Sequence, residues 1–62
     1  MLVKDIIEFY GSASKVAREL NISRQAVSLW VKRGLKHIPE KQALKLEKLT
    51  NGKLKYNMSD YV

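Results

Sequence analysis

The segment ASKVARELNISRQAVSLWVKR, residues 13–33, predicts two short helices joined by a turn of three or four residues. Its first half places apolar residues at the i, i+3, i+4 and i+7 spacing of one helical face. These residues are Ala13, Val16, Ala17 and Leu20. Because the connection is so short, the two helices must pack at a steep angle, which is the pattern of a helix-turn-helix over about residues 13–32.

The turn between these helices has side chains that suit a steep crossing. Ala17 is small at the point where the helices would cross, and Ile22 can fill the corner between them. Asn21 stands where such a turn is expected to need a positive φ angle. Glycine is commoner there, but asparagine tolerates the left-handed region better than most residues. Ser12 and Ser23 offer side-chain oxygens that can cap the two helices.

Helical periodicity extends over most of the remaining chain. We expect an all-α fold, a small bundle of four to five helices in one domain spanning residues 1–62, with helices at about residues 3–9, 13–20, 24–32 and 39–50. Gly11 and the Asn51-Gly52 pair are expected to end helices. The tail after Gly52 is expected to be irregular or a short helical turn. A hairpin between residues 35–38 and 53–57 is the alternative.

The composition limits the class of protein. The chain of 62 residues has no cysteine, so neither a disulfide nor a thiolate metal site can supplement its core. No apolar run is long enough to cross a bilayer, and acidic residues interrupt the apolar N-terminal stretch, which therefore predicts neither a signal peptide nor a membrane span. A small domain without cysteine fits the cytoplasm.

Charge indicates the kind of partner. Twelve lysine and arginine residues against 6 acidic ones give a formal net charge of +6, which favours a polyanion, either nucleic acid or an anionic membrane surface. Residues 20–39 include no acidic residue. The basic residues in this stretch are Arg24, Lys32, Arg33 and Lys36. A solvated basic face without a partner is the alternative.

The helix expected at residues 24–32 has two unlike faces. Val27, Trp30 and Val31 form its expected core face, and their spacing favours packing of Trp30 in the core over stacking of its ring on a base. The opposite face is polar, yet it includes Leu29. This helix is the second of the helix-turn-helix, the one that enters the major groove of DNA when the motif binds DNA.

The polar face matches the chemistry of base edges. Arginine can pair with both acceptors of guanine, glutamine with the donor and acceptor of adenine, and leucine can pack on a thymine methyl group. The residues predicted to read bases are Ser23, Arg24, Gln25, Ser28 and Leu29. Those predicted to contact phosphates, where position matters more than sequence, are Ser12, Ser14, Lys15, Lys32, Arg33 and Lys36. A half-buried Leu29 and a merely solvated Gln25 are the alternative.

Two segments, DIIEFYGSASKVARELNISRQAVSLW (residues 5–30) and IPEKQALKLEKLTNGKLKY (residues 38–56), resemble the Cro repressors of lambda-like phages. The resemblance is greatest to the all-helical branch of that family and to related host-encoded regulators. It implies a lambda-repressor-like DNA-binding domain in the cytoplasm of a bacterial host cell. It also implies a transcriptional repressor that competes for operator DNA in a phage lysis–lysogeny switch.

The expected partner is double-stranded operator DNA, bound by a weak homodimer that forms or strengthens on the DNA, because one short helix offers few base contacts. The dimer contact is expected near residues 35–38 and 54–56. A protein-interaction module, such as an antitoxin or anti-repressor, is the alternative, and it would use an exposed Phe9. A membrane-surface peptide and RNA binding fit the pattern less well.

No pattern indicates catalysis, a metal site or a cofactor. His37 is the only histidine, and no second ligand candidate accompanies it. No nucleophile stands with a base, and no glycine-rich phosphate loop is present. Phe9 either covers the edge of the core or is an exposed contact. We therefore expect a binding protein and not an enzyme.

Overall fold

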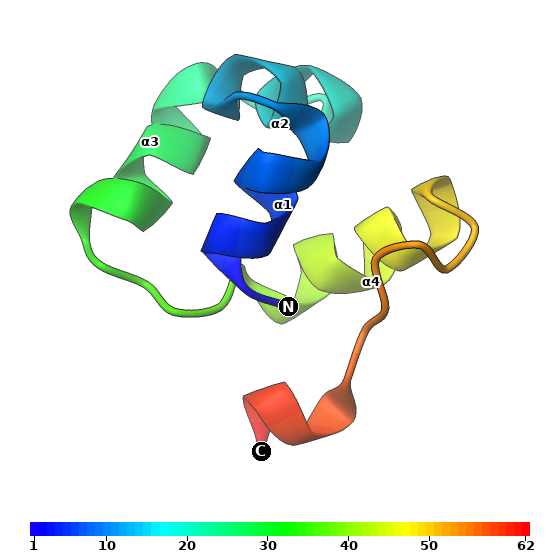
Figure 1. Cartoon of the computed structure of the whole chain (residues 1–62). Helices are drawn as coiled ribbons and strands as arrows, with labels where there is room; N and C mark the ends of the chain where they lie inside the picture. Colours follow the sequence, from blue (N-terminus) through cyan, green and yellow to red (C-terminus); the bar gives the residue numbers. More distant parts are fainter.

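The computed structural model describes all 62 residues as four α-helices followed by one short 3-10 helix. The elements are α1 (Val3–Tyr10), α2 (Ala13–Leu20), α3 (Arg24–Lys32), α4 (Glu40–Leu49) and η1 (Met58–Tyr61). Helix α2 packs against each of the other three α-helices (Figure 1). The all-α prediction is confirmed, and each observed helix begins and ends within one residue of its predicted bounds. None of the helices has the length and apolar character that crossing a membrane requires.

The helix ends follow the predicted capping pattern. Gly11, at φ 95°, ends α1 in the left-handed region, and the Ser12 hydroxyl then accepts a hydrogen bond of 3.2 Å from the Lys15 backbone amide. Asn21 has φ 56°, as the turn was expected to need. The Ser23 hydroxyl accepts from the Ala26 amide at 3.2 Å, which caps α3. These local contacts set where α2 and α3 begin and end.

The core consists of buried apolar side chains only. Its members are Met1, Val3, Ile6, Val16, Ala17, Leu20, Val27, Trp30, Ile38, Ala43 and Leu46. The core prediction was wrong for Val31, whose side chain is 54% exposed. Ala26 is half-buried, so the buried stripe of α3 runs from Ala26 through Trp30 to Val27 around the helix. Val31 lies beyond Val27, outside this stripe.

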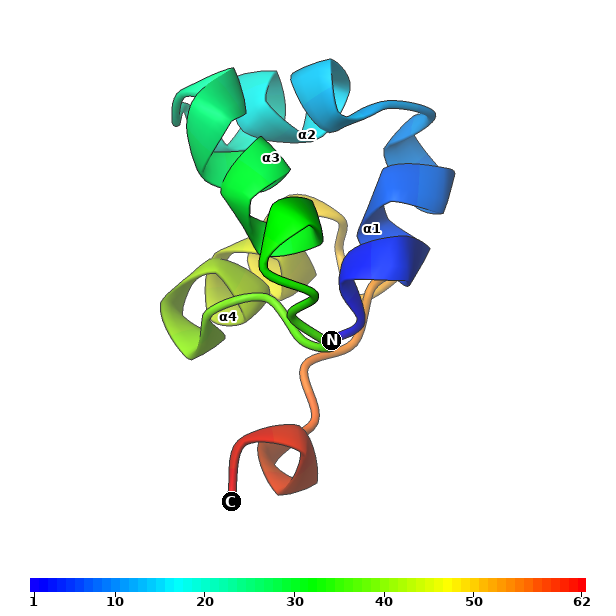
Figure 2. The ribbon, with the colours of Figure 1, turned by 90° about the vertical axis from the view of Figure 1, so that its left-hand side faces the viewer.

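The loop after α3 returns to the start of the chain (Figure 2). Leu2 and His37 form an isolated antiparallel bridge, with the Val3 amide donating to the Lys36 carbonyl and the Ile38 amide to the Met1 carbonyl, both at 3.0 Å. The alternative hairpin between residues 35–38 and 53–57 is wrong, because this single bridge joins residues 2 and 37 and no strand forms.

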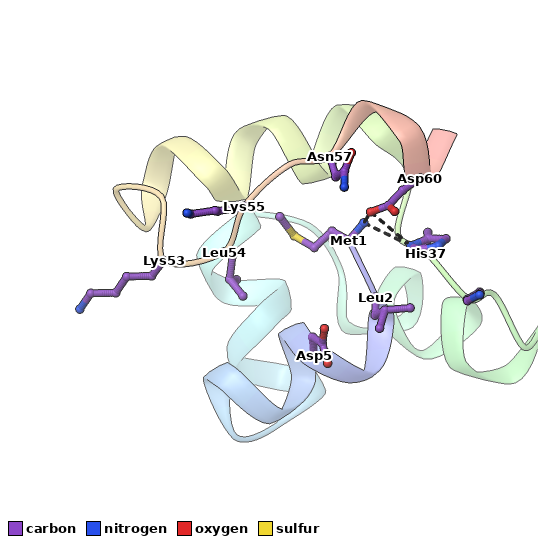
Figure 3. A pocket seen from close by; sticks show the side chains of 10 residues that line it. Met1, Leu2, Asp5, His37, Lys53, Leu54, Lys55, Asn57 and Asp60 are labelled. Atoms are coloured by element: carbon purple, nitrogen blue, oxygen red, sulfur yellow. Dashed lines mark hydrogen bonds and ion pairs between the residues drawn. The ribbon is translucent and has the colours of Figure 1, made fainter. Parts of the chain in front are cut away.

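The tail ends in the short helical turn η1, as predicted. Asp60 lies 2.7 Å from the Met1 amine, which also lies 3.2 Å from Nδ1 of His37 (Figure 3). The ring of Tyr61 stacks on that of Tyr56, with 5.7 Å between their centroids. These contacts hold the tail against the first residues of α1 and the loop before α4.

A contact between Tyr56 and Glu40 should make stability depend on pH in the alkaline range. The phenol donates a hydrogen bond to the Glu40 carboxylate, which raises the pKa of Tyr56 from 10.0 to about 12. A pKa that is raised in the folded state stabilises the fold fully below the unfolded value, and the stabilisation is lost as pH rises through the folded value. The free energy of unfolding in urea should therefore fall between pH 10.0 and about 12. It should fall less steeply in Tyr56→Phe, and equal slopes would contradict this role of the phenol.

Candidate nucleic-acid interface

The outward face of α3 presents most of the residues predicted to read bases. Arg24, Gln25, Ser28 and Leu29 are all exposed, and Leu29 keeps 43% of its surface in contact with solvent. Their side chains form no hydrogen bond or ion pair within the protein. Leu29 therefore stands on the surface among polar neighbours, and it is not part of the core cluster.

Ser23, at the start of this face, also caps α3. Its hydroxyl oxygen already accepts from the Ala26 amide, so within the protein it serves as the cap of α3. A serine hydroxyl still has a hydrogen to donate and a second lone pair. Because Ser23 is exposed, these remain available to a ligand lying along the N-terminal end of α3.

The residues predicted to contact phosphates occupy two places beside α3. Ser14 and Lys15 lie in the first turn of α2 and are exposed, while Ser12 is half-buried and caps that helix. The second group follows the end of α3 along the chain. It consists of Lys32 in the last turn, Arg33 at the C-terminal cap and Lys36 in the loop, all exposed.

The basic side chains of α3 and Arg33 form no ion pair within the protein, whereas Lys36 in the following loop interacts electrostatically with Asp60. The two ion pairs of the structure join Asp60 to the Met1 amine and to His37, away from α3. The sequence contains no acidic residue from 20 to 39, and the first turn of α3 has none either. This surface therefore carries an uncompensated positive charge, which attracts a polyanion.

His37 and Asp60 take part in a cluster that the sequence did not indicate. Nδ1 of His37 lies 3.8 Å from Asp60, and the hydrogen bond from the Met1 amine lowers the pKa of Asp60. A surface cavity of about 550 Å³ opens beside them, and both lysine and aspartate residues line it (Figure 3). No group of three or more histidine, cysteine or acidic residues is placed to hold a metal ion. The cluster connects residues nearly the whole chain apart, so no local pattern could have revealed it.

Phe9 lies at the other end of α1, outside the core. Its side chain is 47% exposed and meets the ring of Tyr10 edge to face, with 5.0 Å between centroids. The Tyr10 hydroxyl is buried and has no hydrogen-bond partner, and burial raises its pKa. Phe9 is thus an exposed residue that also contacts a partly buried neighbour.

The sequence is similar to known proteins over nearly its whole length. The family model described as "DNA-binding transcriptional regulator Cro" matches residues 3–62. The curated "Regulatory protein cro" of Salmonella phage P22 is 44% identical over 61 residues, which cover 98% of this chain and 93% of that protein. No solved structure matches the chain significantly. The chain therefore belongs to the Cro family and is a DNA-binding transcriptional regulator of the Cro type.

Proposed function

We propose that this regulator represses transcription by inserting α3 into the major groove of operator half-sites. One observation supports this above the others: the outward face of α3 is exposed, basic and without partners inside the protein. A face that only solvates the domain would not need the apolar Leu29 on it. In the major groove, Leu29 can bury its side chain against a thymine methyl group.

The start of α3 is the end that would read base edges, because helix-turn-helix proteins direct the N-terminal residues of this helix at the bases. Arg24 can donate two hydrogen bonds to the O6 and N7 atoms of guanine. Gln25 can pair with N6 and N7 of adenine in the same way. Ser23 and Ser28 would add hydrogen bonds to base edges or phosphates. Together these residues would set the operator sequence.

The flanking basic and hydroxyl residues would hold the DNA backbone. Lys15 and Ser14 extend from the first turn of α2, and Lys32, Arg33 and Lys36 extend from the end of α3 and its loop. Contacts of this kind fix the register of the protein on the duplex and carry no sequence information directly. Their binding energy depends on salt, because each neutralised phosphate releases counterions.

We further propose that two copies bind one operator with two-fold symmetry. A single module buries a modest area on DNA, and dimers gain affinity from two half-sites about one helical turn apart. The contact cannot use all of the surface expected from the sequence. Ile38 is fully buried in its own core, and Leu54 and Tyr56 pack against that core. Leu35, which is 40% exposed, remains the apolar residue of this region that a partner can reach.

Selection of bound duplexes from a random pool tests both proposals. The expected result is one enriched consensus that contains an inverted repeat, with half-site centres about 10 base pairs apart. An enriched sequence without an inverted repeat would contradict the dimer and leave operator reading intact. No enrichment at all, despite salt-dependent binding, would contradict sequence-specific repression and favour a basic domain that binds DNA without preference.

A further inference from the structure

The carbonyl groups at the end of α2 differ in their partners. The Asn21 amide donates to the Arg18 carbonyl at 3.2 Å, and the Ile22 amide donates to the Ala17 carbonyl at 3.0 Å. The Leu20 carbonyl accepts no backbone hydrogen bond in the turn. It accepts instead from the side-chain ammonium of Lys45, on α4, at 3.0 Å. A residue 25 positions further along the chain thus completes the end of α2.

This contact joins α4 to the turn of the helix-turn-helix. The peptide unit that contains the Leu20 carbonyl also contains the amide of Asn21, the residue in the left-handed conformation with φ 56°. The C-terminal end of a helix attracts positive charge, so an ammonium group suits this position electrostatically. On either side of Lys45, Ala43 and Leu46 are fully buried, and they anchor α4 in the core.

We infer that Lys45 is a positioning residue that fixes the turn between α2 and α3 and so sets the angle at which α3 is presented to DNA. Its ammonium is already engaged by the protein, unlike those of the lysines predicted to contact phosphates. Loss of this bond leaves the Leu20 carbonyl without its partner and removes a restraint on the Asn21 peptide. The part of this inference that concerns DNA binding rests on the proposed function, whereas the effect of Lys45 on the turn and on the orientation of α3 does not.

The matched variants are Lys45→Met, which keeps most of the alkyl chain, and Lys48→Met. Both lysines are exposed residues of α4, so both variants remove the same charge, but the Lys45 ammonium donates a hydrogen bond within the protein and that of Lys48 does not. The first readout is nuclear magnetic resonance of the full chain without DNA. We expect Lys45→Met to shift the Leu20 carbonyl and Asn21 amide resonances and to change the orientation of α3 relative to α2 in residual dipolar couplings. Lys48→Met should change neither, and Lys45→Arg, which keeps a cationic donor, should lie close to the wild type.

The second readout is binding to the selected operator and to random duplex. Lys45→Met should weaken operator binding by about two- to thirtyfold relative to Lys48→Met. The two variants should bind random duplex equally, and their binding should depend on salt to the same extent. If only Lys45→Met reduced the salt slope, by about one, Lys45 would contact a phosphate and the inference would be wrong.

Two other results would also overturn the inference. Unshifted Leu20 and Asn21 resonances in Lys45→Met would show that the bond does not form in solution. Shifted resonances with an unchanged α3 orientation would show that the bond forms but does not set the position of α3. Failure of the proposed function would look different from both results, because the wild type itself would then prefer no DNA sequence. The resonance measurements do not involve DNA, so they would still test whether Lys45 positions α3. If Lys45→Met does not fold, Lys45→Gln replaces it in the same comparison.

Discussion

Replacing Trp30 with alanine should leave much of the chain unfolded at room temperature. The indole is the largest side chain of the core and is only 8% exposed, so its removal creates a cavity between α3 and the rest of the bundle. Truncation of a buried tryptophan typically costs about 3–5 kcal/mol. A domain this small rarely obtains more than about 3–5 kcal/mol from its core, so the loss is comparable to the whole free energy of unfolding. Urea and thermal unfolding followed by circular dichroism measure the effect.

Val31→Ala is the matched control on the same helix. Because the Val31 side chain is 54% exposed, its truncation should change the free energy of unfolding by no more than about 0.5 kcal/mol. If Val31→Ala destabilised the domain as strongly as Trp30→Ala, α3 would bury a different stripe from the one described. The faces of α3 would then have to be reassigned, together with the proposed base-reading residues.

The triple substitution of Arg24, Gln25 and Leu29 by alanine should abolish the preference for the selected operator. Each base contact contributes about 1–3 kcal/mol of discrimination, so the combined loss should bring operator binding close to binding of random duplex. All three residues are exposed, and therefore the melting temperature should change little. Competition between labelled operator and random duplex measures the preference.

Lys32→Ala separates this effect from a general loss of positive charge. Lys32 lies in the last turn of α3, and as a phosphate contact it should weaken operator and random duplex alike and reduce the salt slope by about one. If the triple variant kept the wild-type preference, α3 would not read the sequence. If Lys32→Ala changed the preference itself, Lys32 would belong to the base-reading residues.

The helices were predictable because their causes are local. Ser12 and Ser23 cap the helices that follow them within three residues, and Asn21 adopts the left-handed turn that its position indicated. Helical spacing left one ambiguity, since Trp30 and Val31 both lie within one turn of Val27. The packing of α3 against α2 determines which of the two is buried, and spacing along a single helix does not contain that information.

The contacts that were missed connect distant parts of the chain. Lys45 counted only as one of 12 basic residues, because its carbonyl partner lies on another helix. Glu47 likewise has a distant partner that no local pattern indicates, because its carboxylate accepts from the Tyr56 amide at 2.8 Å. The outward residues of α3 could be proposed from the sequence, because helical periodicity predicts which side chains face outward and their residue types give the charge. The available dimer surface could not, since burial of Ile38 depends on how the loop returns to Met1.

The capping bond of Ser23 divides the outward residues of α3 into two groups with different evolutionary freedom. A change at Ser23 alters α3 itself, because loss of an N-terminal cap costs about 1 kcal/mol. Arg24, Gln25, Ser28 and Leu29 support nothing inside the protein, so they can be exchanged without lowering its stability. Related regulators that diverge towards new operators should therefore vary at these four positions first. The residue at position 23 should remain restricted to side chains that can cap a helix.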